Sequence, residues 1–117
     1  MRHRVAGRRL DRPTEQRLAL YRNQVTELLD HEKMVTTVAK AKEVKGFAEQ
    51  MITLGKAGDL ASRREALAFI TQDKIVKKVF DVLARRYASR QGGYVRLVRI
   101  GTRQGDASEM AKLELVE

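Results

Sequence analysis

Apolar residues recur every three or four positions in several stretches of the chain, and this spacing predicts helices. A first helix begins at Thr14, directly after Pro13, because threonine is a good N-cap. Its apolar stripe is Leu18, Tyr21, Val25 and Leu28. A second helix is capped by Thr37 and ended by Gly55 and Gly58. Its stripe is Val38, Ala41, Val44, Phe47, Met51 and Leu54.

Two further helices follow. Asp59 suits the N-cap of a short helix that runs through Phe69. A fourth helix is capped by Thr71 or Asp73. Its apolar stripe is Ile75, Val76, Val79, Phe80, Leu83 and Tyr87. This stripe predicts a helix that packs against the core.

Three segments have the composition of strands. Residues 32–37 are short and β-branched, and residues 94–100 and 110–116 flank a turn around Gly101, Gly105 and Asp106. The last two predict a terminal hairpin. We therefore predict an α+β fold with about four helices packed on one face of a small three-stranded sheet. Residues 14–117 form the single globular domain, and residues 1–13 form a basic extended N-terminal arm without apolar periodicity.

Positive charge is concentrated in two segments of this chain of net charge +9. Residues 1–22 carry seven arginines and two acids, and residues 85–103 carry six arginines and no acid. All thirteen basic residues of these segments are arginine, whereas all nine lysines lie elsewhere. Guanidinium grips phosphate oxygens in a bidentate way and stacks on bases, so this sorting favours a structured RNA partner over simple solubilisation.

The sequence offers little to support catalysis, a metal site or a cofactor. There is no cysteine, and His3 and His31 lack metal-ligand spacing with one another. His31 closes the first helix, where an imidazole interacts with the helix dipole. The turn at residues 101–105 lacks the pattern of a phosphate loop. The longest stretch without charge is residues 66–72, far short of the roughly 20 residues that span a bilayer. No apolar segment follows the basic start, which excludes an ordinary secretory signal.

Tyr94 has two interpretations. It follows Gly92 and Gly93 among arginines, a setting in which an aromatic ring can hold an unstacked base. At the start of a strand, an aromatic side chain also packs into the sheet. Arg63 and Arg64 likewise either extend the basic surface or only solvate a short helix.

Motifs along nearly the whole chain resemble the bacterial large-subunit ribosomal protein L-seventeen family. The matching positions are MRHR at residues 1–4, Gly7-Arg8, Leu10, Arg12, Tyr21-Arg22-Asn23, His31-Glu32, Thr36-Thr37, Lys40-Ala41-Lys42-Glu43, Ile52-Thr53-Leu54, Arg86-Tyr87, Arg90, Gly92-Gly93-Tyr94, Arg96, Arg103, Gly105-Asp106, Met110-Ala111 and Glu114-Leu115-Val116. The resemblance implies an α+β fold, binding to large-subunit ribosomal RNA near the nascent-chain exit, neighbouring ribosomal proteins as partners, and no catalysis. It also implies that the early arginines belong to the mature protein and not to a cleavable transit peptide.

We expect RNA contacts from the arm and from the second arginine segment, mostly to phosphates. The expected RNA-binding residues are Arg2, His3, Arg4, Arg8, Arg9, Arg12, Arg17, Arg22, Arg86, Arg90, Tyr94, Arg96, Arg99 and Arg103. We expect no cofactor, metal, membrane or small-molecule substrate, and a cytoplasmic place in the ribosome, with an organellar ribosome as an open alternative. The alternative function is a small basic nucleoid or regulatory DNA-binding protein, for which the charge lies unfavourably on a tail and a loop.

Overall fold

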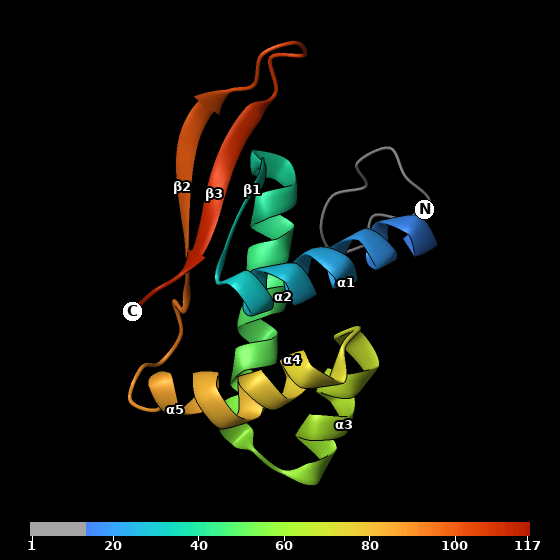
Figure 1. Cartoon of the computed structure of the whole chain (residues 1–117), viewed down its shortest axis with the longest axis vertical. Helices are drawn as coiled ribbons and strands as arrows, with labels where there is room; N and C mark the ends of the chain where they lie inside the picture. Colours follow the sequence, from blue (N-terminus) through green and yellow to red (C-terminus); the bar gives the residue numbers. More distant parts are fainter. Residues whose placement is uncertain (1–13) are drawn as a thin grey trace, which may run out of the picture.

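The structure is a computed structural model and describes residues 14–117, without the side chain of Thr14. The predicted arm, residues 1–13, lies outside the described residues. The helical elements are α1 (Thr14–His31), α2 (Val38–Ala57), α3 (Leu60–Phe69), α4 (Asp73–Lys78), the π-helical segment η1 (Val79–Leu83) and α5 (Ala84–Arg86), and the strands are β1 (Lys33–Thr37), β2 (Val95–Thr102) and β3 (Glu109–Leu115) (Figure 1). Because α4, η1 and α5 follow one another without a break, the described residues hold four helical runs and one sheet, which confirms the predicted α+β class.

The sheet has the order β1-β3-β2, and both pairings are antiparallel. Leu113 of the central strand lies opposite Met34 and Leu97, and these apolar residues face the helices. The next residue, Glu114, lies opposite Lys33 and Arg96 on the other face. We call the face that α1 and α2 cover the inner face, and the opposite one the outer face. This alternation of apolar and charged positions fixes the register, because a slip of one residue would exchange the two faces.

Helix α2 runs through the centre of the molecule and contacts all three strands as well as α1, α3, η1 and α5 (Figure 1). Its N-cap is Thr37, whose hydroxyl accepts a hydrogen bond from the backbone N–H of Lys40 at 3.4 Å, as predicted. Gly58 ends the helix at φ 73°, a left-handed conformation that glycine adopts without strain. Gly55, in contrast, lies inside the helix and is buried against Val79, so the prediction that it helps to end the helix was wrong.

The helical run from Asp73 to Arg86 contains a π segment that the sequence pattern did not predict. The N–H of Ala84 donates to the carbonyl of Val79, five residues back, and the extra residue in this turn shifts the following side chains around the helix axis. Tyr87 is buried directly after the run and donates its hydroxyl hydrogen bond to the carbonyl of Val116. The helical run is thus followed at once by a tyrosine whose hydroxyl is hydrogen-bonded to the residue directly after β3.

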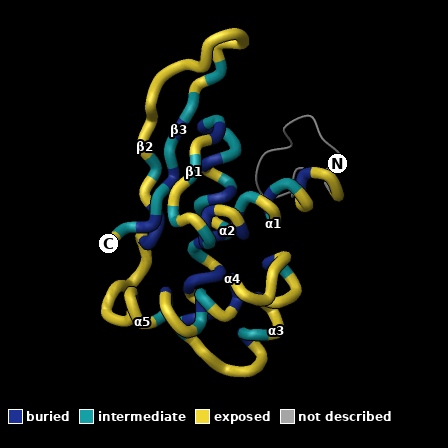
Figure 2. Tube along the Cα trace, viewed as in Figure 1, coloured by how far each residue is buried: buried dark blue, intermediate teal, exposed yellow. Residues whose placement is uncertain are grey.

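Several predicted boundaries and positions change in the structure. The N-cap of α4 is Gln72 rather than Thr71 or Asp73, because the Thr71 hydroxyl instead contacts Thr26 Oγ1 at 3.3 Å. Leu18 is exposed although it continues the α1 stripe, because that end of α1 extends beyond the other described elements (Figures 1 and 2). Glu32 does not open the first strand. It takes φ 67°, and its N–H donates to Leu28 O at 2.7 Å, which reverses the chain between α1 and β1.

Candidate nucleic-acid interface

The structure places eight of the fourteen predicted RNA-binding residues, and the other six belong to residues 1–13, outside the described part. The two arginines on α1, Arg17 and Arg22, do not project fully into solvent. Arg17 is only 7% exposed. Arg22 is half-buried, and its Nε donates to the carbonyl of Phe69 at 2.9 Å, which ties α1 to the end of α3. Both arginine side chains are therefore packed against the protein over much of their surface.

Tyr94 lies in the core and does not present its ring to a base. It is 3% exposed, and its ring lies 5.2 Å from that of Tyr87. Lys56 Nζ donates to the Tyr94 hydroxyl at 2.8 Å, and this hydrogen bond lowers the pKa of the phenol. A buried ring cannot stack on a nucleobase. The expectation of an RNA contact by Tyr94 is therefore corrected in favour of the sheet-packing interpretation.

The loop before Tyr94 is held in place from α2. Lys56 Nζ also donates to the carbonyl of Arg90, and Gly92 and Gly93 take φ values of 87° and 65°. The Arg90 side chain is exposed, but its Nε folds back toward the carbonyls of the two glycines at 3.3 and 3.2 Å. The left-handed glycines and the Lys56 anchor thus give the basic loop a defined shape.

Arg86 forms a bidentate ion pair with the carboxylate of Glu32. Its Nη1 and Nη2 donate to the two carboxylate oxygens of Glu32 at 2.7 and 3.1 Å, and Lys78 Nζ lies 3.0 Å from Oε2 of the same carboxylate. Lys78 also donates to Asp30 O at 2.8 Å. The hydrogen bonds from Arg86 outweigh desolvation and, together with Lys78, lower the pKa of Glu32 to about 2. The network fastens the α1–β1 junction to the helical run of α4–α5.

The arginines of the hairpin are also paired. Arg96 donates from Nε to Glu114 at 2.9 Å, and Arg103 donates from Nε to Asp106 Oδ1 at 3.1 Å. The hydrogen bond from Arg103 lowers the pKa of Asp106 well below its ordinary value. These pairs fix two guanidinium groups along β2 and at the hairpin tip, while leaving about half of each side chain in contact with solvent.

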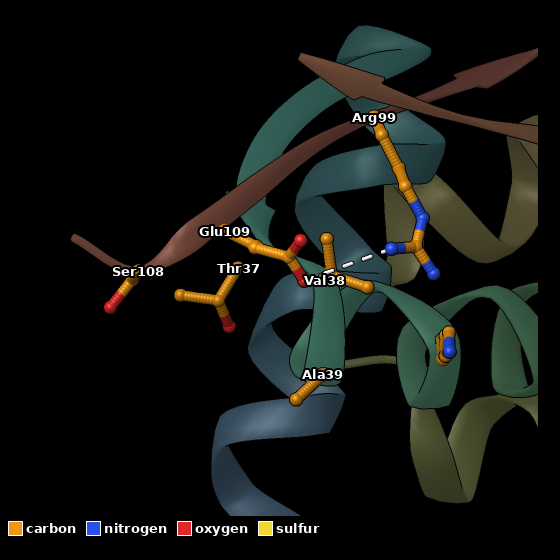
Figure 3. A pocket seen from close by; sticks show the side chains of 7 residues that line it. Thr37, Val38, Ala39, Arg99, Ser108 and Glu109 are labelled. Atoms are coloured by element: carbon orange, nitrogen blue, oxygen red, sulfur yellow. Dashed lines mark ion pairs between the residues drawn. The ribbon is translucent and has the colours of Figure 1, made fainter. Parts of the chain in front are cut away.

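A groove lies between the N-terminal turn of α2 and the inner face of the hairpin (Figure 3). The cavity measures about 450 Å³, and Arg99 enters it from β2. Arg99 Nη1 lies 3.7 Å from Glu109 Oε1, the loosest arginine pair among the described residues. The lining residues are Thr37, Val38, Ala39, Lys42, Arg99, Ser108 and Glu109.

The structure divides the second arginine segment between two regions. Arg86 and Arg90 lie at or just after α5, whereas Arg99 and Arg103 lie near the hairpin tip, at the opposite end of the view in Figure 1. Four of its six arginines have a carboxylate partner from outside the segment or from the turn beyond it. Charge counting along the sequence misses these partners, because Glu32, Glu109 and Glu114 are brought in by the fold. The segment is less positive in the structure than its sequence indicates.

Sequence reasoning missed Lys42 and Glu109 as residues of the groove. Lys42 follows the Thr37 cap by five positions, so the sequence already predicts that it lies near the start of α2. That Lys42 and Arg99 line the same groove depends on how the sheet packs against α2, which the sequence does not show. Among residues 14–117 no cluster of histidines and acids could hold a metal ion. Within the same range, no helix combines the length and apolarity needed to cross a membrane.

Substitution Glu32→Gln is expected to lower the free energy of unfolding by about 1 kcal/mol at pH 7, after allowance for solvent screening of a side chain about one third exposed. The lowered pKa of Glu32 means that its pairing stabilises the fold fully above pH 4.5 and is lost as the pH falls toward 2. Urea unfolding at several pH values measures this difference.

The matched control is Glu27→Gln on α1, an exposed carboxylate without an ion pair among the described residues. We expect its unfolding free energy to stay within about 0.5 kcal/mol of the parent chain. An equal loss in both variants, or a Glu32→Gln effect that persists unchanged at pH 2, would contradict the assigned role of the Glu32 network.

Comparison with known proteins identifies the family. The family model described as ribosomal protein L17 matches residues 20–116. The chain is 58% identical to a large ribosomal subunit protein bL17 of Dehalococcoides mccartyi, over all of both chains. It is 55% identical to that of Clostridium tetani, over 96% of this chain and all of the relative, and 53% identical to that of Trichlorobacter lovleyi, over all of this chain and 94% of the relative. The resemblance seen in the sequence is thus confirmed, and the chain belongs to the ribosomal protein L17 family, whose members are structural proteins and not enzymes.

Proposed function

We propose that this chain is a structural constituent of the large ribosomal subunit and binds ribosomal RNA there, near the nascent-chain exit and beside other ribosomal proteins. The observation that carries the proposal is the match of the whole chain to relatives named as large ribosomal subunit proteins. Because those relatives are bacterial, we propose the cytoplasm as its location. The distribution of arginine supports an RNA contact independently of the relatives.

Two exposed regions and the arm would make the RNA contacts. The first region contains Arg86 and Arg90 around α5, and the second contains Arg99 and Arg103 beside the groove. Arg96 lies between them on β2. The arm would add Arg2, His3, Arg4, Arg8, Arg9 and Arg12. A guanidinium has five N–H donors, so an arginine held by one carboxylate can still donate to a phosphate, and the protein pairs fix its position in advance.

The DNA-binding alternative has no observation in its favour. Neither α1 nor α2 carries an exposed row of arginines, and Arg17 and Arg22 of α1 are largely packed against the protein. The arginines lie instead on a short helix, a loop and a hairpin, which suit the irregular backbone of folded RNA.

Sedimentation tests the proposed function. A lysate is fractionated on sucrose gradients at moderate and high salt, and the chain is detected by immunoblot. We expect the chain to sediment with the large subunit at both salt concentrations. A chain that stays at the top of the gradient or follows DNA would contradict the proposal.

Two substitutions at the groove, with opposite expected effects on RNA affinity, test whether the groove contacts RNA. Arg99→Gln is expected to weaken binding to large-subunit ribosomal RNA about threefold to tenfold, because it removes one phosphate contact. Glu109→Gln is expected to strengthen binding by roughly twofold, because it frees Arg99 from a loose partner. Filter binding at fixed salt measures both affinities. Arg64→Gln, on the exposed side of α3, controls for the loss of one charge, and equal effects of Arg99→Gln and Arg64→Gln would remove the groove from the interface.

A further inference from the structure

The outer face of the sheet carries a patch of branched aliphatic side chains in contact with solvent. Val35, Val98 and Ile100 are 55%, 40% and 52% exposed, and they make up three of the seven large apolar side chains exposed in the described part of the chain. Val35 and Val98 lie opposite Lys112 on either side of the central strand. Ile100 lies two residues beyond Val98 and is the extra residue of the bulge between Arg99 and Gly101. We call these three residues, with Lys112 between them, the aliphatic patch.

No described element covers the aliphatic patch. The helices that contact the sheet, α1 and α2, pack on the inner face, where Ala111, Leu113 and Leu115 are buried. Figure 2 shows β2 largely exposed along its length. The free protein gains nothing from apolar side chains in water, and β-branched residues grouped on a sheet surface are suited to burial against another surface.

The charges around the aliphatic patch indicate what covers it. Beside the patch on the same face, the three strands carry Lys33, Glu114 and Arg96 at paired positions. The carboxylate of Glu114 forms ion pairs with Arg96 and with Lys112, and Lys112 Nζ lies 3.4 Å from Glu114 Oε1. Lys33 has no ion pair within residues 14–117. With three cations and one anion, the surroundings of the patch attract negative charge.

We propose that the outer face of the sheet docks a neighbouring protein of the large ribosomal subunit, through a segment that presents aliphatic side chains flanked by carboxylates. This inference rests on the proposed function. Aliphatic side chains fill the centre of the contact, and the partner's carboxylates meet Lys33 at its rim. The RNA-binding arginines at the groove and around α5 then lie outside this contact, so one molecule binds RNA and protein at once.

RNA and a second copy of the chain fit this face less well. The strands of the outer face have no aromatic residue on which a base could stack, and the exposed side chains of Val35 and Val98 offer no hydrogen-bond donor to a phosphate. Two copies placed face to face would oppose surfaces of the same net positive charge.

Site-specific crosslinking tests the proposal. The photoreactive amino acid p-benzoylphenylalanine replaces Val98, and, in a control chain, Val82, which is exposed on η1. Large subunits are purified from cells that carry each chain, irradiated and analysed by mass spectrometry. We expect position 98 to crosslink to another large-subunit protein, at a peptide that contains both aliphatic and acidic residues, at a yield at least about fivefold above position 82.

Each other outcome overturns the inference. A crosslink from position 98 to RNA or to a second copy would assign the outer face to that partner instead. If the chain is present in the subunit but forms no crosslink at position 98, no partner covers the outer face of the sheet. A chain that is absent from the subunit would instead refute the proposed function, and the sedimentation profile distinguishes this case.

A double variant provides a second measurement that does not depend on the photoreactive group. Val35→Thr with Val98→Thr keeps the branched shape but makes the patch polar. In competition with the parent chain during subunit reconstitution, we expect incorporation to fall on the order of tenfold, with affinity for purified ribosomal RNA changed less than twofold. Equal losses in both assays would overturn the inference, and circular dichroism verifies that the variant is folded.

Discussion

Deletion of residues 1–12 is expected to weaken binding to large-subunit ribosomal RNA by on the order of 100-fold to 1,000-fold at physiological salt. The deletion removes Arg2, Arg4, Arg8, Arg9 and Arg12. If each arginine neutralises one phosphate, the slope of log affinity against log salt becomes less steep by roughly 4 to 5, taking about 0.9 per contact as for duplex DNA. Titrations at several salt concentrations measure the affinity and the slope together.

Two controls accompany the deletion. The buried core is built from residues 21–115, so the shortened chain is expected to unfold cooperatively at nearly the parent denaturant concentration. A full-length chain with lysine at the five arginine positions keeps the charge but loses the planar fork. We expect its salt slope to match that of the parent and its affinity to lie between the two others. An unchanged slope in the deletion would refute the proposed role of the arm.

Gly55→Ala is expected to destabilise the fold by about 1–3 kcal/mol. A Cβ atom at Gly55 would lie 2.8 Å from Val79 Cγ1 and 3.0 Å from the carbonyl oxygen of Val79, which belongs to the π segment. Neither atom yields easily, because valine is stiff at χ1 and the carbonyl accepts the hydrogen bond from Ala84. Chemical denaturation with circular dichroism measures the loss.

The control for this variant is the same substitution about two and a half turns earlier in the helix, at Gly46. A Cβ there meets nothing within 4 Å, so Gly46→Ala is expected to stabilise the fold by roughly 0.5–1 kcal/mol through helix propensity alone. Opposite signs at the two glycines would establish that α2 and η1 are in close contact. A stabilising Gly55→Ala would contradict that packing.

Local signals predicted the helices and strands well. Thr37, Asp59 and Gly58 are caps whose chemistry acts within a few residues, and each is found where the sequence indicated. The errors arose where a distant residue decides. Thr71 contacts Thr26 instead of capping α4, and Gly55 is small because Val79 packs on it rather than to end a helix. Periodicity also misses a π segment, because one extra residue changes the phase without changing the apolar character of the stripe.

The amino-acid composition of the candidate interface was predictable from the sequence, but the arrangement of its side chains was not. The arginine segments were visible in the sequence, and so was the choice of arginine over lysine. The carboxylates that hold Arg86 and Arg96 come from Glu32 and Glu114, which lie 54 and 18 positions away. For Tyr94 both interpretations were consistent with the local sequence, and only the contact with Lys56 and Tyr87 decided between them.

The sheet order has a consequence for the protein before it joins any assembly. Because β3 is central, β2 is an edge strand, and unpaired backbone groups of such a strand are a template for aggregation. Arg96 and Arg99 stand on this edge, and the bulge at Gly101 breaks its regular hydrogen-bonding pattern. Charge and a bulge are the devices by which proteins prevent edge-to-edge pairing. The arginines and the bulge of β2 therefore disfavour the addition of one unassembled copy to another along this edge.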